Sequence, residues 1–373
     1  MSLNVLIAPD KFKGTLSARA AADAMTRGWR QARPADHLMP FPISDGGDGF
    51  GDLVGAGLGA RTETVCTVDA AHHPCAAEWW WAAESGTAII EAARVNGLAR
   101  LPAGKHHPFE LDTFGLGAVL ASARAMGARR CLIGIGGSAT NDGGFGMARS
   151  LGWTFSDDRG ATIERWTQLH SLSRCQPPPT AGWPNDMLVA VDVQNPLLGP
   201  SGCTRVYGPQ KGLREEDFNL AERSLARLAE VVECQLHCSR ADEPGAGAAG
   251  GLGFGLRSFL GARLVPGFGL FADHTGLKER LSAADLVVTG EGAIDSSTFM
   301  GKGVGELALL CRQSNTPCLG LGGALFDRAA AALFFTRAYA LTPDLTDRDT
   351  AFANAGEWLA RLAAHAAAAW HDP

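Results

Sequence analysis

The sequence predicts an α/β protein: a doubly wound parallel sheet with a second α/β domain of mixed sheet inserted into it. Three observations predict this class. Short apolar runs alternate with helical segments at both ends of the chain, the middle changes to closely spaced strands, and 373 residues is the length of about two domains. A hydrophobic content of 46% also excludes a disordered chain.

The N-terminal elements form a strand–helix–strand unit. Residues 5–9 are an apolar run typical of a parallel strand, and residues 37–43 form the next one. Between them Ser17 is the predicted N-cap of a helix over residues 18–31. A helix between two strands is the usual crossover of a parallel pair, so we expect these strands to be parallel neighbours.

The middle of the chain begins with three short strands at residues 61–69, 74–82 and 87–91. Turn signals separate them, which indicates an antiparallel meander rather than crossovers. Further along we expect a helix over 115–126, strands over 131–135 and 187–191, and a helix over 215–236.

The alternating pattern returns in the last hundred residues. We expect strands over 286–289, 317–321 and 338–341, and helices over 305–312 and 352–370. Together with the two N-terminal strands this makes five, the number in a flavodoxin-like sheet.

The strand count predicts the domain organisation. Residues 1–60 and 262–373 would form the flavodoxin-like domain, and residues 61–261 the inserted one, with the active site in the cleft between them. Ligands of open α/β sheets bind beyond the carboxyl ends of the strands, where the strand order reverses. That rule places Asp10-Lys11 close to Gly290-Glu291.

Composition excludes several partners. The net charge is −6 with no basic block, so nucleic acid is not an expected partner. No apolar run approaches the roughly 18 residues of a membrane span, so we expect a soluble, cytoplasmic protein. Nine cysteines without a C-x-x-C pair indicate ordinary reduced thiols rather than a zinc site.

A Gly-rich segment at residues 134–144 follows a predicted buried strand and precedes an apparent helix. In this setting backbone N–H groups hold phosphate. Ser138, Thr140 and Asn141 would add side-chain donors. A tight turn with an N-cap is the alternative interpretation.

A second Gly-rich segment, residues 244–253, contains G-x-G-x-x-G at Gly245, Gly247 and Gly250. A helix and a polar stretch precede it instead of a strand, so the sequence does not predict a dinucleotide site. Either a phosphate-facing or a close-packed helix start fits the pattern.

Acidic residues accompany two further Gly-rich segments at predicted strand ends. Asp45 and Asp48 lie in residues 44–49, and Glu291 and Asp295 in residues 289–295. Carboxylates beside phosphate-binding backbone indicate a hydrated Mg²⁺, although each segment alone is also a common turn.

Two more segments carry polar groups, Asp192 with Asn195 and Arg205 with Lys211. The cations lie in what the sequence presents as a Gly-Pro loop, and solvated surface charge is the alternative for them. No G-x4-G-K-[ST], G-x-S-x-G or H-E-x-x-H motif occurs, which leaves acid–base chemistry to carboxylates.

Taken together, the ordered motifs resemble those of the bacterial glycerate kinase family over nearly the whole chain. They are APDKFKGTLSA (8–18), SDGGDGF (44–50), GIGGSATNDGG (134–144), DVQNPLLG (192–199), RVYGPQKG (205–212), PGAGAAGGLGFG (244–255) and TGEGAIDSST (289–298). The resemblance implies a flavodoxin-like domain interrupted by a second α/β domain. It also implies phosphorylation of D-glycerate by ATP with Mg²⁺, usually at the 2-hydroxyl, by a monomer or homodimer.

Within that resemblance we assign expected roles. Asp192 or Asp45 would accept the hydroxyl proton, and Glu291 and Asp295 would hold Mg²⁺. The residues expected to hold phosphates are Gly136, Gly137, Ser138, Thr140, Asn141, Gly247, Gly250, Gly251 and Lys302. The residues expected to hold the acceptor and the transferring phosphoryl group are Lys11, Asn195, Arg205 and Lys211.

Three positions depart from the family pattern. Arg94 and Asn96 stand where small residues are usual, and Ala118 replaces a glutamate. If Arg94 or Ala118 lines the acceptor pocket, the substrate would be another small hydroxy acid, and the resemblance leaves 2- and 3-phosphoglycerate open as products. A nucleotide- or metabolite-binding homologue without turnover is the remaining alternative.

Overall fold

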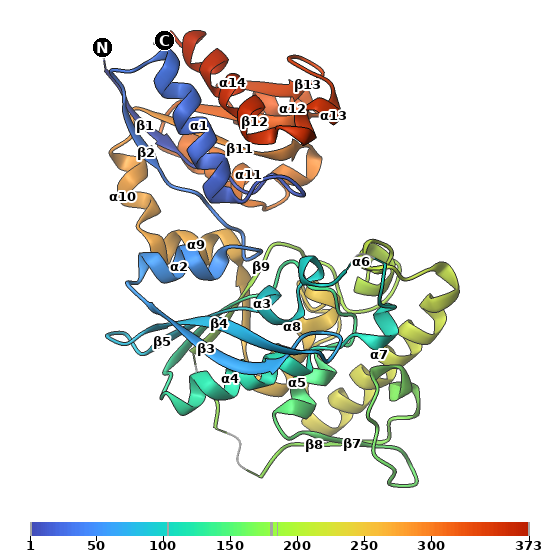
Figure 1. Cartoon of the computed structure of the whole chain (residues 1–373). Coiled ribbons are helices and arrows are strands. Elements are labelled where there is room, and N and C mark those ends of the chain that lie inside the picture. Colours follow the sequence, from blue (N-terminus) through green and yellow to red (C-terminus); the bar gives the residue numbers. More distant parts are fainter. Residues whose placement is uncertain (1, 103, 180–181, 185, 372–373) are drawn as a thin grey trace. The chain divides into compact units, whose positions relative to one another are not determined.

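The computed structural model describes residues 2–102, 104–179, 182–184 and 186–371, which divide into two compact units (Figure 1). Unit 1 comprises Met1–Asp45 and Phe268–Pro373, and unit 2 comprises Gly46–Gly267. These boundaries differ from the predicted 60/61 and 261/262.

The earlier first boundary follows from the packing of helix α2 (Phe50–Gly57). This helix contacts strands β4 and β5 of unit 2, and its Gly51 and Gly55 lie against the Trp80 ring. A Cβ at Gly51 would lie 1.9 Å from that ring, so α2 belongs to unit 2.

Unit 1 is built on a parallel five-stranded sheet in the order β13-β12-β11-β1-β2, which joins strands from the N-terminal and C-terminal segments of the chain (Figure 1). Its strands are β1 (Asn4–Ile7), β2 (His37–Pro40), β11 (Leu286–Ile294), β12 (Cys318–Leu325) and β13 (Arg337–Thr342). Numbered within the unit, this order is 2-1-3-4-5, the flavodoxin-like order. The predicted fold class and five-strand count are confirmed, and the strand order reverses between β1 and β11.

Helices cover the sheet of unit 1, whose strand β1 is fully buried at Val5, Leu6 and Ile7. Ser17 caps the first helix as predicted, because its Oγ accepts the N–H of Ala20 at 3.2 Å. The helices are α1 (Ala18–Ala32), α9 (Gly267–Thr275), α10 (Leu277–Ser282), η4 (Ser296–Phe299), α11 (Gly303–Gln313), α12 (Arg328–Phe334), α13 (Arg348–Ala353) and α14 (Ala355–Ala368).

Unit 2 is built on a mixed six-stranded sheet in the order β10-β9-β6-β5-β4-β3. Strands β3 to β5 pair antiparallel, which confirms the predicted meander, and β5, β6, β9 and β10 pair parallel. Its strands are β3 (Arg61–Val68), β4 (Pro74–Ala82), β5 (Thr87–Glu91), β6 (Arg130–Gly134), β9 (Asp186–Val191) and β10 (Arg263–Pro266), with β7 (Thr154–Ser156) and β8 (Arg174–Gln176) as a separate pair.

The longest helix of unit 2, α7, runs over Glu215–Leu236 as predicted, and its Leu225, Leu228 and Val232 are fully buried. The remaining helical segments are α2, α3 (Ala93–Asn96), η1 (Leu98–Arg100), η2 (Pro108–Glu110), α4 (Phe114–Ala125), α5 (Phe145–Ser150), η3 (Trp166–Ser171), α6 (Cys203–Lys211) and α8 (Ala248–Leu260).

Three predicted elements differ from the structure. The strand predicted over 286–289 continues to Ile294, because β12 extends in parallel and pairs with its second half. The predicted C-terminal helix breaks at Asn354 into α13 and α14. The predicted Gly-Pro loop at 205–212 is mostly helix α6, which contains Pro209 and ends at Gly212 with a φ of 107°.

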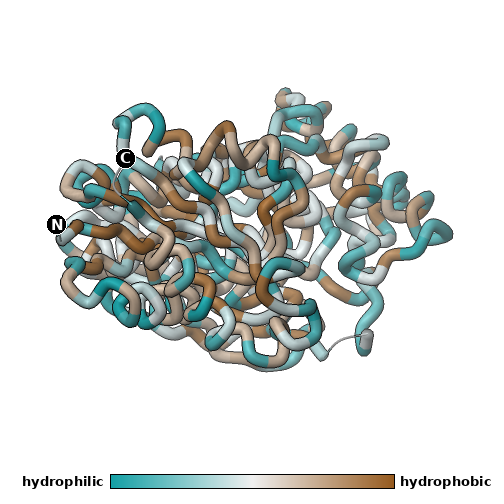
Figure 2. The backbone as a smooth tube through the Cα atoms, turned by 90° about the horizontal axis from the view of Figure 1, so that it is seen from above, coloured by the Kyte–Doolittle hydropathy of each residue, from teal (hydrophilic) through white to brown (hydrophobic). Residues whose placement is uncertain are grey.

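Hydrophobic stretches of the backbone alternate with hydrophilic loops in both parts of the chain (Figure 2). No helix in the described ranges has the length and apolar character needed to cross a bilayer. All nine cysteines are free in the structure, and five of them are buried.

Candidate active site

Three carboxyl groups of unit 1 lie at the point where its strand order reverses. Asp10 follows β1, and its N–H donates to the carbonyl of Gly290 in β11 at 2.9 Å. Asp10 and Asp45 are only 7% and 9% exposed. Burial first, and then the negative charges of Asp45 and Glu291, raise the pKa of Asp10 well above its usual value, against the opposing charge of Lys11.

Glu291 shares this environment from the middle of β11. Burial raises the pKa of Glu291 to about 7, and the charges of Asp45 and Asp295 add to the increase. A 2.7 Å hydrogen bond from the Thr298 hydroxyl and the charge of Lys302 act in the opposite direction. Carboxyls that titrate near neutrality cluster at functional sites, because catalysis requires groups that hold and release protons there.

Substitution Glu291→Gln is expected to change how stability depends on pH. The folded protein holds the Glu291 proton up to a pKa of about 7, whereas the unfolded chain releases it near 4.5. This group therefore stabilises the fold at low pH, and the contribution of about 2–3 kcal/mol is lost as the pH rises from about 4.5 to 7. Urea unfolding of metal-free protein at pH 5 and 7.5 gives the free energy of unfolding at each pH, and the difference measures this contribution.

In that experiment the wild type loses stability relative to Glu291→Gln on going to pH 7.5. Glu279→Gln is the matched control, since Glu279 is an exposed carboxylate of the same unit. Equal pH dependence in the wild type and Glu291→Gln would contradict the assignment of a buried, proton-holding Glu291.

Asp295 and Lys302 lie on the segment that follows β11. The Asp295 carboxylate caps η4, because it accepts the N–H and the hydroxyl of Ser297 at 2.8 and 2.5 Å. Lys302 Nζ donates to the same hydroxyl at 2.6 Å. Although burial favours its neutral form, these hydrogen bonds and the charge of Lys302 lower the pKa of Asp295, so it is an ionised carboxylate at neutral pH.

The donor set of unit 1 fits Mg²⁺ better than a metal held entirely by protein. Within the described ranges, no group of three or more acidic, histidine or cysteine side chains converges in a geometry that could hold a metal. Mg²⁺ is usually bound by one or two carboxylates, with phosphate oxygens and water as its other ligands. Glu291 and Asp295 can supply those two carboxylates.

The Gly-rich loop of unit 2, residues 134–144, begins at the end of β6. Gly136 and Ala139 donate their N–H groups to carbonyls of unit 2 at 3.1 and 2.8 Å. In the part of the chain that the structure describes, no acceptor is paired with the N–H of Gly137 or of Ser138. Gly137 has a φ of 78°, and successive N–H groups in such a left-handed turn can form an anion-binding concavity.

The polar side chains of this loop point into the protein. The hydroxyls of Ser138 and Thr140 lie 2.9 Å apart, and Asn141 Nδ2 donates to the Thr204 hydroxyl at 3.0 Å. Thr140 and Asn141 are fully buried. The loop therefore offers a ligand its backbone rather than these two side chains.

The second Gly-rich segment packs closely on the first. A Cβ at Gly250 would lie 1.9 Å from the carbonyl oxygen of Thr140, and a Cβ at Gly251 would lie 2.8 Å from Gly143 Cα. The N–H groups of Gly247 and Gly251 donate to protein carbonyls at 2.9 and 3.3 Å. The close-packed helix start fits this geometry, and phosphate binding by Gly247, Gly250 and Gly251 stays a prediction.

The two cations of the 205–212 segment both lie on helix α6 but in different environments. Lys211 is 8% exposed, and its Nζ donates to the carbonyl of Thr140 at 2.7 Å. No ion pair joins it to a carboxylate among the described residues. Arg205 is exposed, with its guanidinium 5.8 Å from the centre of the Phe218 ring.

Asn195 follows β9 and is fixed by two hydrogen bonds. Its Oδ1 accepts the Tyr207 hydroxyl at 2.5 Å, and its Nδ2 donates to the carbonyl of Ser201 at 2.7 Å. Burial, followed by the charge of Asp192, raises the pKa of Tyr207 to about 12, so the phenol stays a neutral donor. The structure thus brings Asp192, Asn195 and Tyr207 together.

Arg94 is engaged by acidic side chains of unit 2. Its guanidinium contacts Asp52 at 2.6 Å, Glu78 at 3.2 Å and Glu91 at 3.4 Å. It also lies 5.3 Å from the centre of the Trp80 ring. Its charge is therefore already balanced within the protein, and its predicted role at the acceptor stays untested.

Asp10, Asp142 and Tyr207 are polar groups of these clusters that the sequence did not single out for a role. Asp10 precedes Lys11 at the end of β1, and Asp142 ends the Gly-rich loop, so their positions beside predicted motifs were the available signal. Tyr207 lies on helix α6, which places it one turn from Lys211. The sequence did not predict this helix and therefore gave no sign of that relation.

Comparisons with known proteins identify the family. A family model described as the glycerate kinase family matches residues 5–371. The glycerate kinase of Bacillus subtilis is 35% identical, with 98% of this chain and 97% of that protein aligned. The glycerate 2-kinase of Escherichia coli is 36% identical over 87% of this chain and 86% of its own length.

A solved structure shares the fold. The crystal structure of a protein from Salmonella typhimurium LT2, provisionally named glycerate kinase 2, has a TM-score of 0.77 and 32% identity. The match covers 99% of this chain and 98% of the Salmonella chain. The chain therefore belongs to the glycerate kinase family, a family of phosphotransferases.

Proposed function

We propose that this protein transfers a phosphoryl group from ATP to the 2-hydroxyl of D-glycerate, with Mg²⁺ as cofactor. Membership of the glycerate kinase family supports the reaction class. The name of the E. coli relative, glycerate 2-kinase, supports the 2-hydroxyl as the acceptor.

One observation carries the assignment of phosphate chemistry to unit 2. Lys211 is a buried ammonium without an ion-paired carboxylate among the described residues, and it contacts the loop whose Gly137 and Ser138 N–H groups have no acceptor there. A buried charge is costly unless an opposite charge balances it. A bound phosphate would balance this ammonium and accept both N–H groups.

The other groups have roles that follow from their geometry. Asp45 lies beside Asp10 and Glu291, whose pKa values are both raised, and is the proposed acceptor of the proton from the hydroxyl; Asp192 is the second candidate for this step. Asn195, Arg205 and Lys11 are the proposed partners of the acceptor carboxylate and the transferring phosphoryl group. Lys302 is the proposed cation for a further phosphate.

Mg²⁺ would be held by Glu291 and Asp295. When bound, it would neutralise the charge that develops on the phosphate oxygens. The Glu291 carboxyl must release its proton to bind a cation, so metal binding is expected to be weaker at pH 6 than at pH 8.

The first test is ADP release with Mg²⁺ across D-glycerate, L-glycerate, glycolate, lactate and tartronate, with the product identified by phosphorus NMR. Turnover on D-glycerate to 2-phosphoglycerate is the expected result. Formation of 3-phosphoglycerate would correct the position, and activity on another acid alone would correct the acceptor. ADP binding without turnover on any of the five would favour the non-catalytic homologue.

A further inference from the structure

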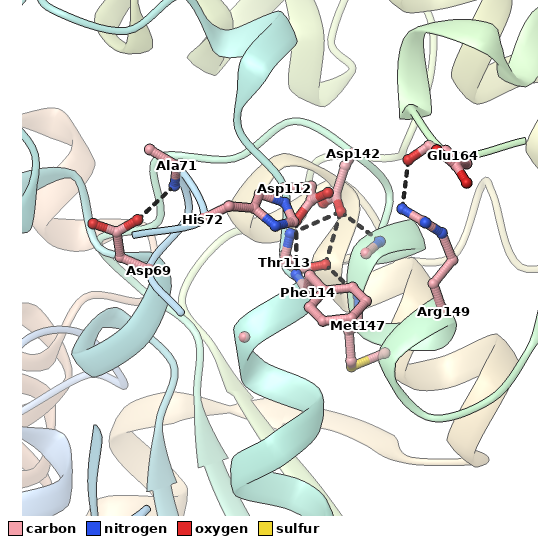
Figure 3. Close-up of polar contacts among 12 residues, drawn as sticks. Asp69, Ala71, His72, Asp112, Thr113, Phe114, Asp142, Met147, Arg149 and Glu164 are labelled. Carbon is pink, nitrogen blue, oxygen red and sulfur yellow. Dashed lines mark hydrogen bonds and ion pairs between the residues drawn. The ribbon is translucent and has the colours of Figure 1, made fainter. Parts of the chain in front are cut away.

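The side chain of Asp142 connects the Gly-rich loop by hydrogen bonds to the start of helices α4 and α5 (Figure 3). This side chain is fully buried. Its Oδ2 accepts the N–H and the hydroxyl of Thr113 at 3.0 and 2.7 Å and the N–H of Gly146 at 2.9 Å, and its Oδ1 accepts the N–H of Gly144 at 3.3 Å. Thr113 immediately precedes α4, and Gly146 lies in the first turn of α5.

Lys211 holds the same loop two residues earlier, through the carbonyl of Thr140. One buried charged group thus binds the loop at Thr140, and the other belongs to the loop two residues later. An ammonium taken out of water loses its hydration, so a negative group nearby is needed to keep it protonated.

In the protein without a bound phosphate, Asp142 is the negative group that fits this need, although it forms no direct ion pair with Lys211 among the described residues. Burial lowers the pKa of Lys211 to about 8, while Cys203 and Asp142 act in the opposite direction. Burial also raises the pKa of the Cys203 thiol to about 12, so that thiol is neutral at physiological pH and contributes no charge. Burial and the nearby Asp112 raise the pKa of Asp142 to about 6, so between about pH 6 and 8 Asp142 is negative while Lys211 is positive.

On the Asp142 side of this pair, Asp112 and His72 are charged or titratable neighbours (Figure 3). His72 Nε2 lies 3.0 Å from Asp112 Oδ1, so its charge acts first on Asp112. The charged and titratable groups that act on Asp142, Lys211 and these neighbours are Asp69, His72, Asp112, Arg149, Cys203 and Glu222.

We propose that Asp142 is a positioning residue of the phosphate-binding loop: without touching the ligand, its buried carboxylate fixes the loop and keeps Lys211 positively charged. The proposal rests on the proposed function in one respect only, which is that the ligand of the loop is a phosphate. The charge relation between Asp142 and Lys211 can be tested in the protein alone.

The direct test is the titration of Lys211 by NMR of protein labelled with ¹³C at the lysine ε-carbon. The chain has six lysines, Lys11, Lys13, Lys105, Lys211, Lys278 and Lys302, so the spectrum is simple. The resonance absent from Lys211→Gln identifies Lys211. In Asp142→Asn its titration midpoint is expected to fall by about half a pH unit or more, because the stabilising negative charge is gone.

Thr113→Val is the matched control. It removes a hydrogen bond to the Asp142 carboxylate and leaves the charge in place, so the Lys211 midpoint is expected to stay where it is in the wild type. An unchanged midpoint in Asp142→Asn, or an equal fall in Thr113→Val, would overturn the proposal.

Two further measurements separate this proposal from a failure to fold and from a failure of the proposed function. If Asp142→Asn does not fold, the Lys211 resonance of the wild type must still show a smaller inflection near pH 6, where Asp142 ionises, and Asp112→Asn must move it to lower pH. Absence of that inflection would overturn the proposal.

The second measurement is ADP affinity. In folded Asp142→Asn the loss of affinity is expected to be about two- to threefold larger at pH 8 than at pH 6.5, because the altered charge state of Lys211 adds to any loss that comes from the loop. A loss of the same size at both pH values would show a purely structural role. Failure of the wild type to turn over D-glycerate would concern the proposed function alone, since neither the NMR titration nor ADP binding requires turnover.

Discussion

Asp45→Asn is expected to lower kcat by about 10²–10⁴-fold, the usual contribution of a general base. Asp45 lies beside Asp10 and Glu291, whose pKa values are raised, and it raises both of them by its own charge. An amide at this position can neither accept the hydroxyl proton nor maintain the proton-holding cluster. ADP release with saturating D-glycerate and MgATP measures the effect, together with ADP affinity, which is expected to stay unchanged.

Two variants make this result specific. Asp23→Asn removes an exposed carboxylate of α1 in the same unit and is expected to leave kcat unchanged. Asp192→Asn tests the alternative base. A wild-type kcat in Asp45→Asn, with a large loss in Asp192→Asn, would assign the proton to Asp192 instead.

Gly137→Val is expected to weaken nucleotide binding by about 100-fold or more. Gly137 has a φ of 78°, and a Cβ there would lie 2.6 Å from Asp48 Oδ1. A branched side chain therefore displaces the Asp48 carboxylate and twists the peptide whose N–H is proposed to face phosphate. Calorimetric titration with ADP measures the affinity, and thermal unfolding measures any loss of stability.

Gly127→Val provides a closely matched control. Gly127 has almost the same φ, 79°, but no atom lies within 4 Å of the position of its Cβ. Both variants place a branched side chain at a similar positive φ in unit 2, so their backbone strain is similar. A difference in ADP affinity between them therefore reports on the loop at residues 136–138. Equal ADP affinities in the two variants would show that residues 136–138 form only a turn.

The sequence predicted most of the strands and helices, because their hydrophobic periodicity is strong. Strands β4 and β5 and helix α7 have the predicted bounds, and the parallel and antiparallel parts of the two sheets follow from the spacing of the strands. Helix α6 was missed because Gly208-Pro209 is typical of a turn. The Pro209 ring lacks an N–H, but it lies near the end of the helix, which stops at Gly212.

The site was less predictable than the fold. Motifs located the polar segments, but the direction in which each side chain points depends on contacts between segments far apart in the sequence. Lys211 is buried and Arg205 is exposed. Both lie on the helix that the sequence did not predict, so the difference between the two side chains could not be predicted either. Arg94 is held by Asp52 and Glu78, 42 and 16 residues away, which no local pattern could reveal.

The two-segment construction of unit 1 has a consequence for the order in which the chain is synthesised and folds. Strand β1 pairs with β11, and Asn4 contacts Asp285, which lies 281 positions further along the chain. On the ribosome, β1 and β2 emerge first but have no neighbouring β11 until about three quarters of the chain has been made. Unit 2 is continuous, so we expect it to fold first, while the exposed N-terminal strands wait and depend on chaperones for protection against aggregation.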